Sequence, residues 1–304
     1  MHSKRLIAIL ITVGVIIITG GCQTGKQSMI KTDSNMPELS EAALPNYSVG
    51  EYFSFDDGTA VVVTAVSKEQ VTWRYNNGAI SSGYRNFILP ALTWTSAHSY
   101  SKTTSTAPVD LLWPLVTGNK GQFSSHQVIS RNDRIESTEL SRNWECSVEG
   151  TKRVSVPAGT FDTYVIACKR YSTTNNSWRA TRRYYYAPDL GHYVMRDDSF
   201  RSRSDRTRKL AAYGFNSTFL PKQEQINLNK KLQITLSKNP DGIASTWESK
   251  PGDITAMLVP VNSYSGLNGT ECRDYYSVYS IKGRIRKNAR SVCRSPEGLW
   301  QRID

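Results

Sequence analysis

The sequence predicts a mostly β protein made of two antiparallel β domains. The first is expected to be a sandwich or partly open barrel, and the second a small disulfide-linked sheet preceded by one helix. Short β-branched and aromatic runs alternate with turn residues from Val49 onwards, and long helical periods are rare. The four cysteines that follow residue 22 also form two closely spaced pairs.

Length and composition place the chain among folded, basic proteins. Its 304 residues suffice for two domains, and 38% hydrophobic residues with 16 Tyr and 7 Trp exclude a wholly disordered chain. Lys and Arg exceed Asp and Glu by 38 to 26. This excess favours acidic polymers or anionic surfaces as partners, the alternative being that it only keeps the protein soluble. No nucleic-acid partner is expected, because an exported protein meets other polyanions.

The first 21 residues have the pattern of a signal peptide. Lys4 and Arg5 precede an apolar run over 6–18, which is shorter than the roughly 20 residues of a spanning helix. The run leads into Thr19-Gly20-Gly21-Cys22, which resembles a lipobox, with threonine in place of the usual leucine. The resemblance implies cleavage before Cys22 and a stable membrane anchor of acyl chains such as palmitate. The alternative is an ordinary secretory leader with an incidental cysteine.

Residues 22–46 are predicted to form a flexible tether. They are polar, rich in Gly, Ser, Asn and Pro, and show no apolar period. Gln23 resembles the residue found after the anchor cysteine in lipoproteins that are sent on to the outer membrane. We therefore expect a lipid-anchored outer-membrane protein that faces the periplasm or the cell surface.

Turn residues divide the first predicted domain, residues 47–215, into strands. Asp57-Gly58 separates 52–55 from 59–66, and Asn76-Asn77-Gly78 follows a strand over 71–75. Further strands are predicted around 122–130, 140–149, 151–156, 161–171, 178–186 and, with a break, 192–213.

The cysteines of an exported chain are expected to form disulfides. Four cysteines allow three connectivities, and we favour Cys146 with Cys168 and Cys272 with Cys293, because each pair stays within one domain. A simple hairpin about residues 157–159 does not place Cys146 opposite Cys168. The first disulfide therefore requires a β-bulge, for which Gly150 is suitable.

The second predicted domain covers residues 216–304. Residues 222–236 fit strand alternation about as well as a helical face, and we favour a helix. A two-residue turn at Lys282-Gly283 makes directly opposed positions sum to 565, that is 282 + 283, so that Cys272 faces Cys293. Lysine is unfavourable at positive φ, so a glycine bulge is the alternative turn.

Two parts of the chain resemble known envelope proteins. Leu112 to Leu115, Pro157 to Thr163 and Tyr185 to Pro188 resemble a family of Gram-negative envelope proteins that share a PAGTF turn and a Y-A-P strand end. This resemblance covers roughly residues 47–215. It implies an all-β envelope module and supplies no enzyme mechanism.

The carboxy-terminal part resembles the rickettsial-type surface-antigen lipoproteins over roughly residues 226–304. The residues that carry the resemblance are Glu271 to Tyr275, Val292 to Arg294, Glu297-Gly298 and Trp300. It implies an outer-membrane-associated lipoprotein and a surface-antigen-like domain over 216–304. The chain lacks the glycine-rich segment of many members, so no role of that segment is carried over.

Two cationic stretches are candidate binding surfaces. In the terminal hairpin, tyrosine and arginine share one strand face, and the preferred interpretation is a solvated strand face held by cross-strand contacts. The alternative is a surface that binds an anionic or sugar-containing polymer, because arginine pairs with acidic groups and tyrosine stacks on rings. The residues of this predicted face are Arg273, Tyr275, Tyr279, Arg286 and Arg290.

The second stretch is either a polyanion contact or a charged edge strand that resists aggregation, and the edge strand is the preferred interpretation. Its residues are Arg196, Arg201, Arg203, Arg206, Arg208 and Lys209, with three aspartates between them.

The chain carries no local catalytic or metal-binding signature. It has no G-x-S-x-G, P-loop, H-E-x-x-H or C-x-x-C motif. We expect no metal, no cofactor and no enzyme activity, the alternative being a triad assembled across the fold. The predicted function is a non-enzymatic structural or binding component of the cell envelope. The alternatives are a binder of peptidoglycan or anionic polysaccharide, a partner of another envelope protein and, ranked last, a periplasmic hydrolase.

Overall fold

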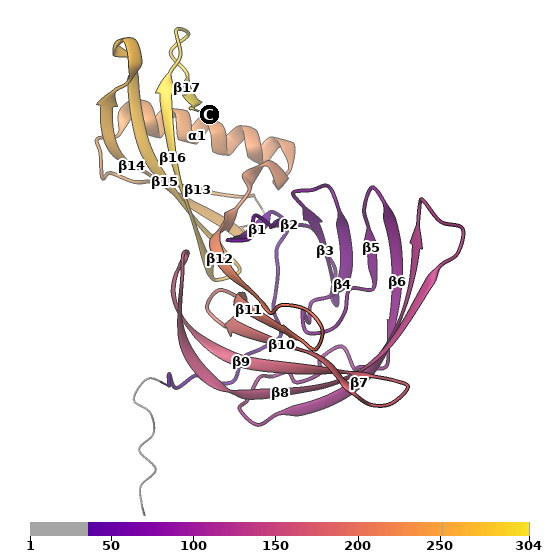
Figure 1. Ribbon diagram of the computed structural model, residues 1–304. Coiled ribbons are helices and arrows are strands. Elements are labelled where there is room, and N and C mark those ends of the chain that lie inside the picture. The colour runs from indigo at the N-terminus through magenta and orange to yellow at the C-terminus, as the bar shows by residue number, and fades with distance from the viewer. Residues whose placement is uncertain (1–35, 251, 304) are drawn as a thin grey trace, which may run out of the picture. The chain divides into compact units, whose positions relative to one another are not determined.

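The computed structural model describes residues 36–250 and 252–303. Within them, twelve strands close into an antiparallel barrel and five form a separate sheet (Figure 1). The predicted fold class is confirmed, and the first domain is a closed barrel. Each barrel strand pairs with the next in the chain, and β12 returns to pair with β1, so closure leaves no unpaired strand edge.

The barrel strands run from residue 51 to residue 215. Their bounds are β1 Glu51–Phe55, β2 Ala60–Val66, β3 Gln70–Tyr75, β4 Ile80–Tyr84, β5 Thr93–Thr95, β6 Ser99–Ser105, β7 Lys120–Arg131, β8 Thr138–Val156, β9 Gly159–Ser172, β10 Trp178–Ala187, β11 His192–Phe200 and β12 Arg206–Phe215. The predicted hairpin turns at residues 57–58 and 76–78 are confirmed, since they join β1 to β2 and β3 to β4.

Strands β4, β5 and β6 escape prediction because they lack an apolar alternation. Their buried positions include Ser81, Ser101 and Thr103, which are polar in sequence although they face inward. An alternating pattern needs apolar residues on the buried face, so these strands resemble a polar loop.

The long strand β8 contains the predicted bulge. The register between β8 and β9 shifts between Val148 and Gly150, and Gly150 has a φ of 151° that favours glycine. Beyond the shift, Cys146 lies opposite Cys168, and the two form a disulfide. The bulge therefore joins two predicted strands, 140–149 and 151–156, into one bent strand.

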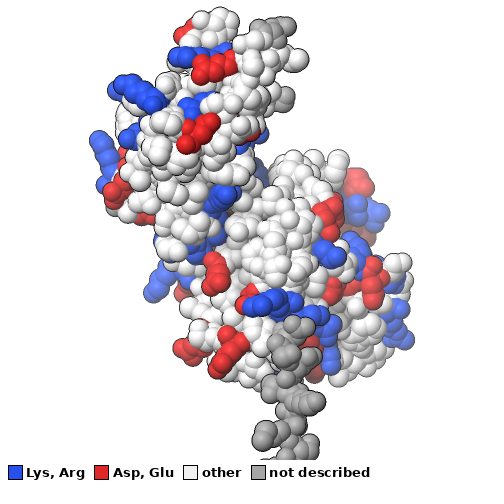
Figure 2. Space-filling view, turned by 90° about the vertical axis from the view of Figure 1, so that its left-hand side faces the viewer, with Lys and Arg blue, Asp and Glu red and all other residues white. Residues whose placement is uncertain are grey.

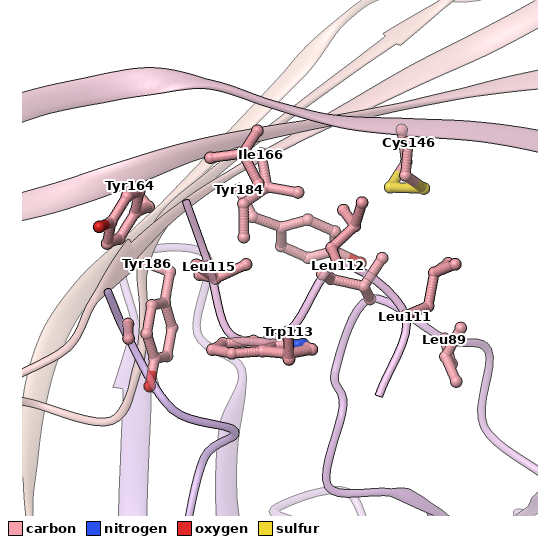
Figure 3. Packing of buried hydrophobic residues seen from close by; sticks show 14 of the residues in the cluster. Leu89, Leu111, Leu112, Trp113, Leu115, Cys146, Tyr164, Ile166, Tyr184 and Tyr186 are labelled. Atoms are coloured by element: carbon pink, nitrogen blue, oxygen red, sulfur yellow. A yellow bond between two sulfur atoms is a disulfide. The ribbon is translucent and has the colours of Figure 1, made fainter. Parts of the chain in front are cut away.

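One apolar cluster lies beneath β8, β9 and β10. Figure 3 shows Trp113 and Leu115, from the loop before β7, packed toward Ile166 and Tyr186 of the strands. Asn86 holds two loops together here, because its amide nitrogen donates to the carbonyl oxygens of Val109 and Leu111. Irregular segments thus fill part of the barrel interior.

The predicted tether is wrong for residues 36–46. Ala42 and Leu115 exchange backbone hydrogen bonds of 3.2 and 2.8 Å, and Tyr164 donates to the carbonyl oxygens of Leu39 and Ser40. Leu39 and Leu44 pack against the apolar cluster. These apolar residues attach the segment to the barrel, which explains why it is ordered despite its polar composition. The rest of the predicted tether, the signal peptide and Cys22 lie outside the described residues.

The carboxy-terminal part is a five-stranded sheet with one helix. The helix α1, Lys222–Lys238, lies against β13 and β14 and buries Leu228 and Leu236, so the predicted helix is confirmed. The strands are β13 Ser245–Glu248, β14 Ile254–Ser265, β15 Glu271–Ile281, β16 Arg284–Arg294 and β17 Trp300–Arg302.

The terminal hairpin has the predicted register. Lys282 and Gly283 have φ values of 50° and 77°, as a tight two-residue turn requires. Cys272 lies directly opposite Cys293 and forms a disulfide with it. The turn residues alone therefore set the pairing of β15 with β16.

A buried ion-pair cluster joins the barrel to the terminal hairpin. Glu51 of β1 is 0% exposed and forms ion pairs with two arginines. Arg284 Nη2 lies 2.8 Å from Glu51 Oε2, and Arg286 Nη2 lies 2.7 Å from Glu51 Oε1. Arg286 also donates to the carbonyl oxygen of Leu190. The described residues belong to one compact unit, and the boundary at 215/216 stays a prediction.

Candidate binding site in the barrel

The tyrosine and arginine face of the terminal hairpin is turned inward. Arg273, Tyr275, Tyr279 and Arg286 are 1–6% exposed, and only Arg290 is partly exposed. Helix α1 and the end of the barrel cover this side of the sheet. Both interpretations of the face, as a polymer platform and as a solvated strand face, are therefore wrong about its exposure.

The structure separates the five residues into three places. Tyr275, Tyr279 and Arg290 line a hollow of about 220 Å³ between α1 and the sheet. Arg286 lies instead in the buried cluster with Glu51, and Arg273 donates to the carbonyl oxygen of Leu236 and to Asp241. Arg273 and Arg286 thus have structural partners that occupy their guanidinium groups.

A larger set of chemically useful side chains lines a cavity of about 230 Å³ inside the barrel. Strands from opposite sides of the barrel contribute to it, so it lies between them. Its wall is rich in aromatic rings and includes no Asp or Glu among the described residues. The aromatic lining residues are Phe55, Trp73, Tyr75, Tyr84, Phe87, Trp144, Tyr184 and Tyr193.

Three arginines complete the wall of this cavity. Arg182 of β10, Arg196 of β11 and Arg208 of β12 come from consecutive strands. Arg196 and Arg208 are directly opposed across the β11–β12 pair. Like charges in opposed positions destabilise a sheet, so this arrangement requires a compensating anion.

Asp198 provides part of that compensation. Its carboxylate lies 2.6 Å from Arg182 Nε and 2.9 Å from Arg196 Nη2. Burial acts to raise the pKa of Asp198, but the charges of Arg182 and Arg196 outweigh it and lower the pKa below the ordinary value. Asp198 therefore stays ionised, and it holds both guanidinium groups at the cavity wall.

The cationic stretch at 196–209 is not a protected edge. Strands β11 and β12 are paired on both sides in the closed barrel, so the edge-strand interpretation is wrong. Arg208 pairs with Asp57, with Nη2 2.6 Å from Oδ2, and its guanidinium carbon lies 5.3 Å from the centre of the Phe55 ring. The inward-facing members of this stretch belong to the cavity wall.

His192 is held neutral at the base of the cavity. Tyr47 Oη lies 2.8 Å from His192 Nδ1, and the imidazole stacks on Phe53 with ring centres 4.1 Å apart. Burial, and next the charge of Arg286, lower the pKa of His192 to about 3. Its Nε2 is buried without a hydrogen-bond partner among the described residues, so a polar ligand can bind there.

The outer surface carries no comparable concentration of charge on the face shown in Figure 2, where Lys and Arg alternate with Asp and Glu. Among residues 36–250 and 252–303, no group of His, Cys, Asp or Glu side chains is placed to hold a metal ion. No helix in the same ranges has the length and apolarity needed to cross a membrane.

The chain has partial likenesses to curated proteins, and no family model matches it. It is 29% identical over 72 residues to the 17 kDa surface antigen of Rickettsia felis, a match covering 24% of this chain and 45% of that protein. The match to the 17 kDa surface antigen of Rickettsia prowazekii is 27% identical over 82 residues, covering 27% and 52%. The chain thus spans about half the length of the curated relatives it matches.

Two solved structures are similar to part of this chain. The hypothetical lipoprotein YmcC of Escherichia coli aligns with 53% of this chain and 82% of its own, at 12% identity and a TM-score of 0.38. A putative exported protein with a YmcC-like fold from Bacteroides fragilis aligns with 57% and 99%, at 12% identity and a TM-score of 0.35.

Sequence reasoning missed the barrel cavity, because nothing in the sequence shows that its lining residues come together. The signal lay in the alternation of arginine with apolar residues, as in Arg182 and Tyr184 of β10 and Arg208 and Leu210 of β12. Alternation assigns such residues to one face of a strand. It does not say that the face turns into a closed barrel.

Proposed function

We propose that the protein is a non-enzymatic binding component of the bacterial envelope, anchored to the outer membrane through a lipid on Cys22, whose barrel cavity binds an anionic saccharide. The signal peptide and lipobox-like residues support the anchor. The likenesses to a surface antigen are in keeping with an envelope location. The single observation that carries the binding proposal is the aromatic cavity wall with its three arginines, whose carboxylate partners Asp198 and Asp57 are not among the lining residues.

The chemistry of the wall favours a charged sugar over other small molecules. Guanidinium groups form paired hydrogen bonds with carboxylates and phosphates. Flat aromatic rings such as Trp73 and Tyr75 offer apolar faces on which a sugar ring can lie. At about 230 Å³ the cavity is smaller than the roughly 300–1,000 Å³ typical of drug-sized ligand sites, so it accommodates the end unit of a glycan rather than its length.

A cavity-filling variant tests this proposal. Ser81 lies on the cavity wall and is buried, whereas Ser82 is on the opposite face of β4 and hydrogen-bonds Thr72. Ser81→Phe is expected to occupy the cavity and to weaken binding of trigalacturonate at least tenfold in calorimetric titration. Ser82→Phe is the matched control and should bind as the unaltered protein does.

The neutral trisaccharide maltotriose provides the chemical control. The proposal expects trigalacturonate to bind more tightly than maltotriose, with a preference that declines as salt is added. Equal binding of the two sugars, or full binding by Ser81→Phe with a native thermal transition, would refute the cavity as the site.

A further inference from the structure

A hollow distinct from the one under α1 lies beside the barrel cavity and is lined by more arginines than the cavity is. Its volume is about 440 Å³, and four arginines line it together with Tyr171 and serines. These arginines are Arg142 of β8, Arg170 of β9, Arg179 of β10 and Arg201. Among the described residues, its lining includes no Asp or Glu.

The hollow and the cavity adjoin along β8 and β9. Trp144 lines the cavity and lies opposite Arg170, which lines the hollow. Arg142 is two residues from Trp144 on the same strand face, a separation of roughly 7 Å at the usual rise of about 3.3 Å per residue. One ligand of modest length can therefore contact both.

The four guanidinium groups of the hollow have no carboxylate partner within ion-pair distance among the described residues. The acids that neutralise the cavity arginines are Asp198 and Asp57, and neither pairs with this set. Arg142 Nη1 donates to Gln127 Oε1, a neutral acceptor, at 2.9 Å. The hollow thus concentrates positive charge without its own counter-ion.

Electrostatic strain at these positions agrees with the geometry. Burial lowers the pKa of Arg142, and the charges of Arg170 and Arg182 lower it further. Burial likewise lowers the pKa of Arg170, followed by the charges of Arg182 and Arg203, and the charge of Asp198 offsets only part of this lowering. An anion bound between Arg142 and Arg170 would offset the repulsion among the arginine charges. A dianion would offset more of this repulsion than a monoanion would.

We infer that this hollow is a subsite for a phosphate monoester carried by the ligand of the barrel cavity. The inference rests on the proposed function and narrows its ligand to a phosphorylated saccharide. A phosphate monoester carries close to two negative charges at neutral pH and three acceptor oxygens, which matches a hollow lined by four arginines better than one carboxylate does.

Glucose 6-phosphate, glucuronate and glucose are suitable probes because they share a ring and differ in charge. In titrations of the purified mature chain carrying Cys22→Ser, glucose 6-phosphate is expected to bind at least tenfold more tightly than glucuronate. The double variant R142Q/R170Q should remove that preference and leave glucuronate binding in place. Arg134 and Arg302 are exposed, so R134Q/R302Q is the control with the same change in net charge and should keep the preference.

Two further measurements keep the result interpretable. Arg170→Lys retains the charge without the paired donors and should bind glucose 6-phosphate with intermediate affinity, which separates recognition from loss of folding. Ser81→Phe should weaken both charged sugars. Binding of both sugars with equal affinity, unaffected by R142Q/R170Q, would overturn the phosphate subsite while leaving the proposed function intact.

A lipid headgroup and a soluble sugar can present the same phosphate monoester. Sedimentation with phosphatidylcholine vesicles containing phosphatidic acid tests the lipid source, and vesicles containing the diester phosphatidylglycerol are the control. Cosedimentation that needs phosphatidic acid and is lost in R142Q/R170Q supports the subsite with a lipid as its source. If R142Q/R170Q alters neither glucose 6-phosphate binding nor cosedimentation with phosphatidic acid, the phosphate subsite is contradicted.

Discussion

At the residue scale, Glu51 is the acid of the buried ion-pair cluster. Its carboxylate is fully buried, accepts a hydrogen bond of 2.7 Å from Ser48 N, and faces both Arg284 and Arg286. Burying charges is costly, and the mutual attraction offsets the cost only while all partners are present. Glu51 therefore acts as the counter-ion that allows the hairpin arginines to lie against the barrel.

Glu51→Gln is expected to lower the free energy of unfolding by about 3–5 kcal/mol, because it leaves two guanidinium groups without their counter-ion. Urea denaturation followed by tryptophan fluorescence measures this change. Glu149 pairs with Arg183 at a more exposed site, and Glu149→Gln should cause a much smaller loss. Similar losses for the two variants would contradict the structural role of the buried cluster.

His192 should make stability depend on pH. Its pKa is lowered to about 3 in the folded protein from an ordinary value of 6.5, so between these values the unfolded chain binds a proton that the native protein does not. Unfolding free energy should therefore fall as the pH drops from about 6.5 towards 3, at up to roughly 1.4 kcal/mol per pH unit from this residue.

The variant His192→Phe isolates the contribution of this residue. Phenylalanine can keep the stacking on Phe53 but cannot take up a proton, so the slope of stability against pH should be reduced over the same range. Denaturation at intervals between pH 7 and pH 4 provides the comparison. An unchanged slope would show that His192 is not the group that titrates.

At the scale of elements, turn chemistry predicts strand pairing wherever the turn is short. Lys282-Gly283 fixes the register of β15 with β16, and Gly150 supplies the bulge that brings Cys146 to Cys168. In both cases a local backbone requirement determines a contact between residues more than twenty positions apart. The ends of β1 and β3 are likewise set by short glycine-containing turns, at residues 57–58 and 76–78.

Removing either disulfide should lower stability, because each closes a loop of similar length, with sequence separations of 22 and 21. The double serine variant of either pair is expected to lose about 2–5 kcal/mol, with the chain-entropy model giving about 3. Thermal melts with and without reductant measure the effect.

The two disulfides should differ in their effect on the ligand. Cys146 and Cys168 lie on the strands beside the cavity, whereas Cys272 and Cys293 join the distant sheet strands β15 and β16. Loss of the first pair should weaken trigalacturonate binding, and loss of the second should leave it unchanged. The reverse pattern would argue against a ligand in the barrel.

Elements without apolar alternation or a tight turn escape prediction. The inward faces of β4 and β6 carry serine and threonine, and the segment 36–46 is attached by backbone hydrogen bonds that any residue can form. The covering of the hairpin face by α1 is equally invisible, since alternation identifies a face but not what lies against it. These features depend on tertiary packing, which local sequence does not specify.

At the scale of the whole molecule, the predicted anchor makes Cys22 decisive for location. Two or three acyl chains hold a protein stably to a bilayer, at about 0.8 kcal/mol per buried CH₂. Cys22→Ser should therefore move the protein from the outer-membrane fraction to the soluble periplasmic or extracellular fraction. Mass spectrometry of the amino terminus should show acylation of the unaltered protein only, and an unlipidated amino terminus would contradict the anchor.

The binding site emerges only when the chain closes on itself. Arg182, Arg196 and Arg208 are spread over 27 positions of sequence, yet they line one cavity because β10, β11 and β12 are neighbours in a barrel. Composition shows the cationic excess and suggests a binding role for arginine and tyrosine. It does not show whether these side chains lie inside a closed barrel or face solvent on an open sheet.

Hydrogen–deuterium exchange with and without trigalacturonate tests the central claim most directly. The account predicts slower exchange, on ligand addition, in the strands that line the cavity, namely β1, β2, β3, β4, β8, β10, β11 and β12, with little change in β14, β15 and β16. Protection confined to the carboxy-terminal sheet, or no protection at ligand concentrations that saturate binding, would contradict a binding site inside the barrel.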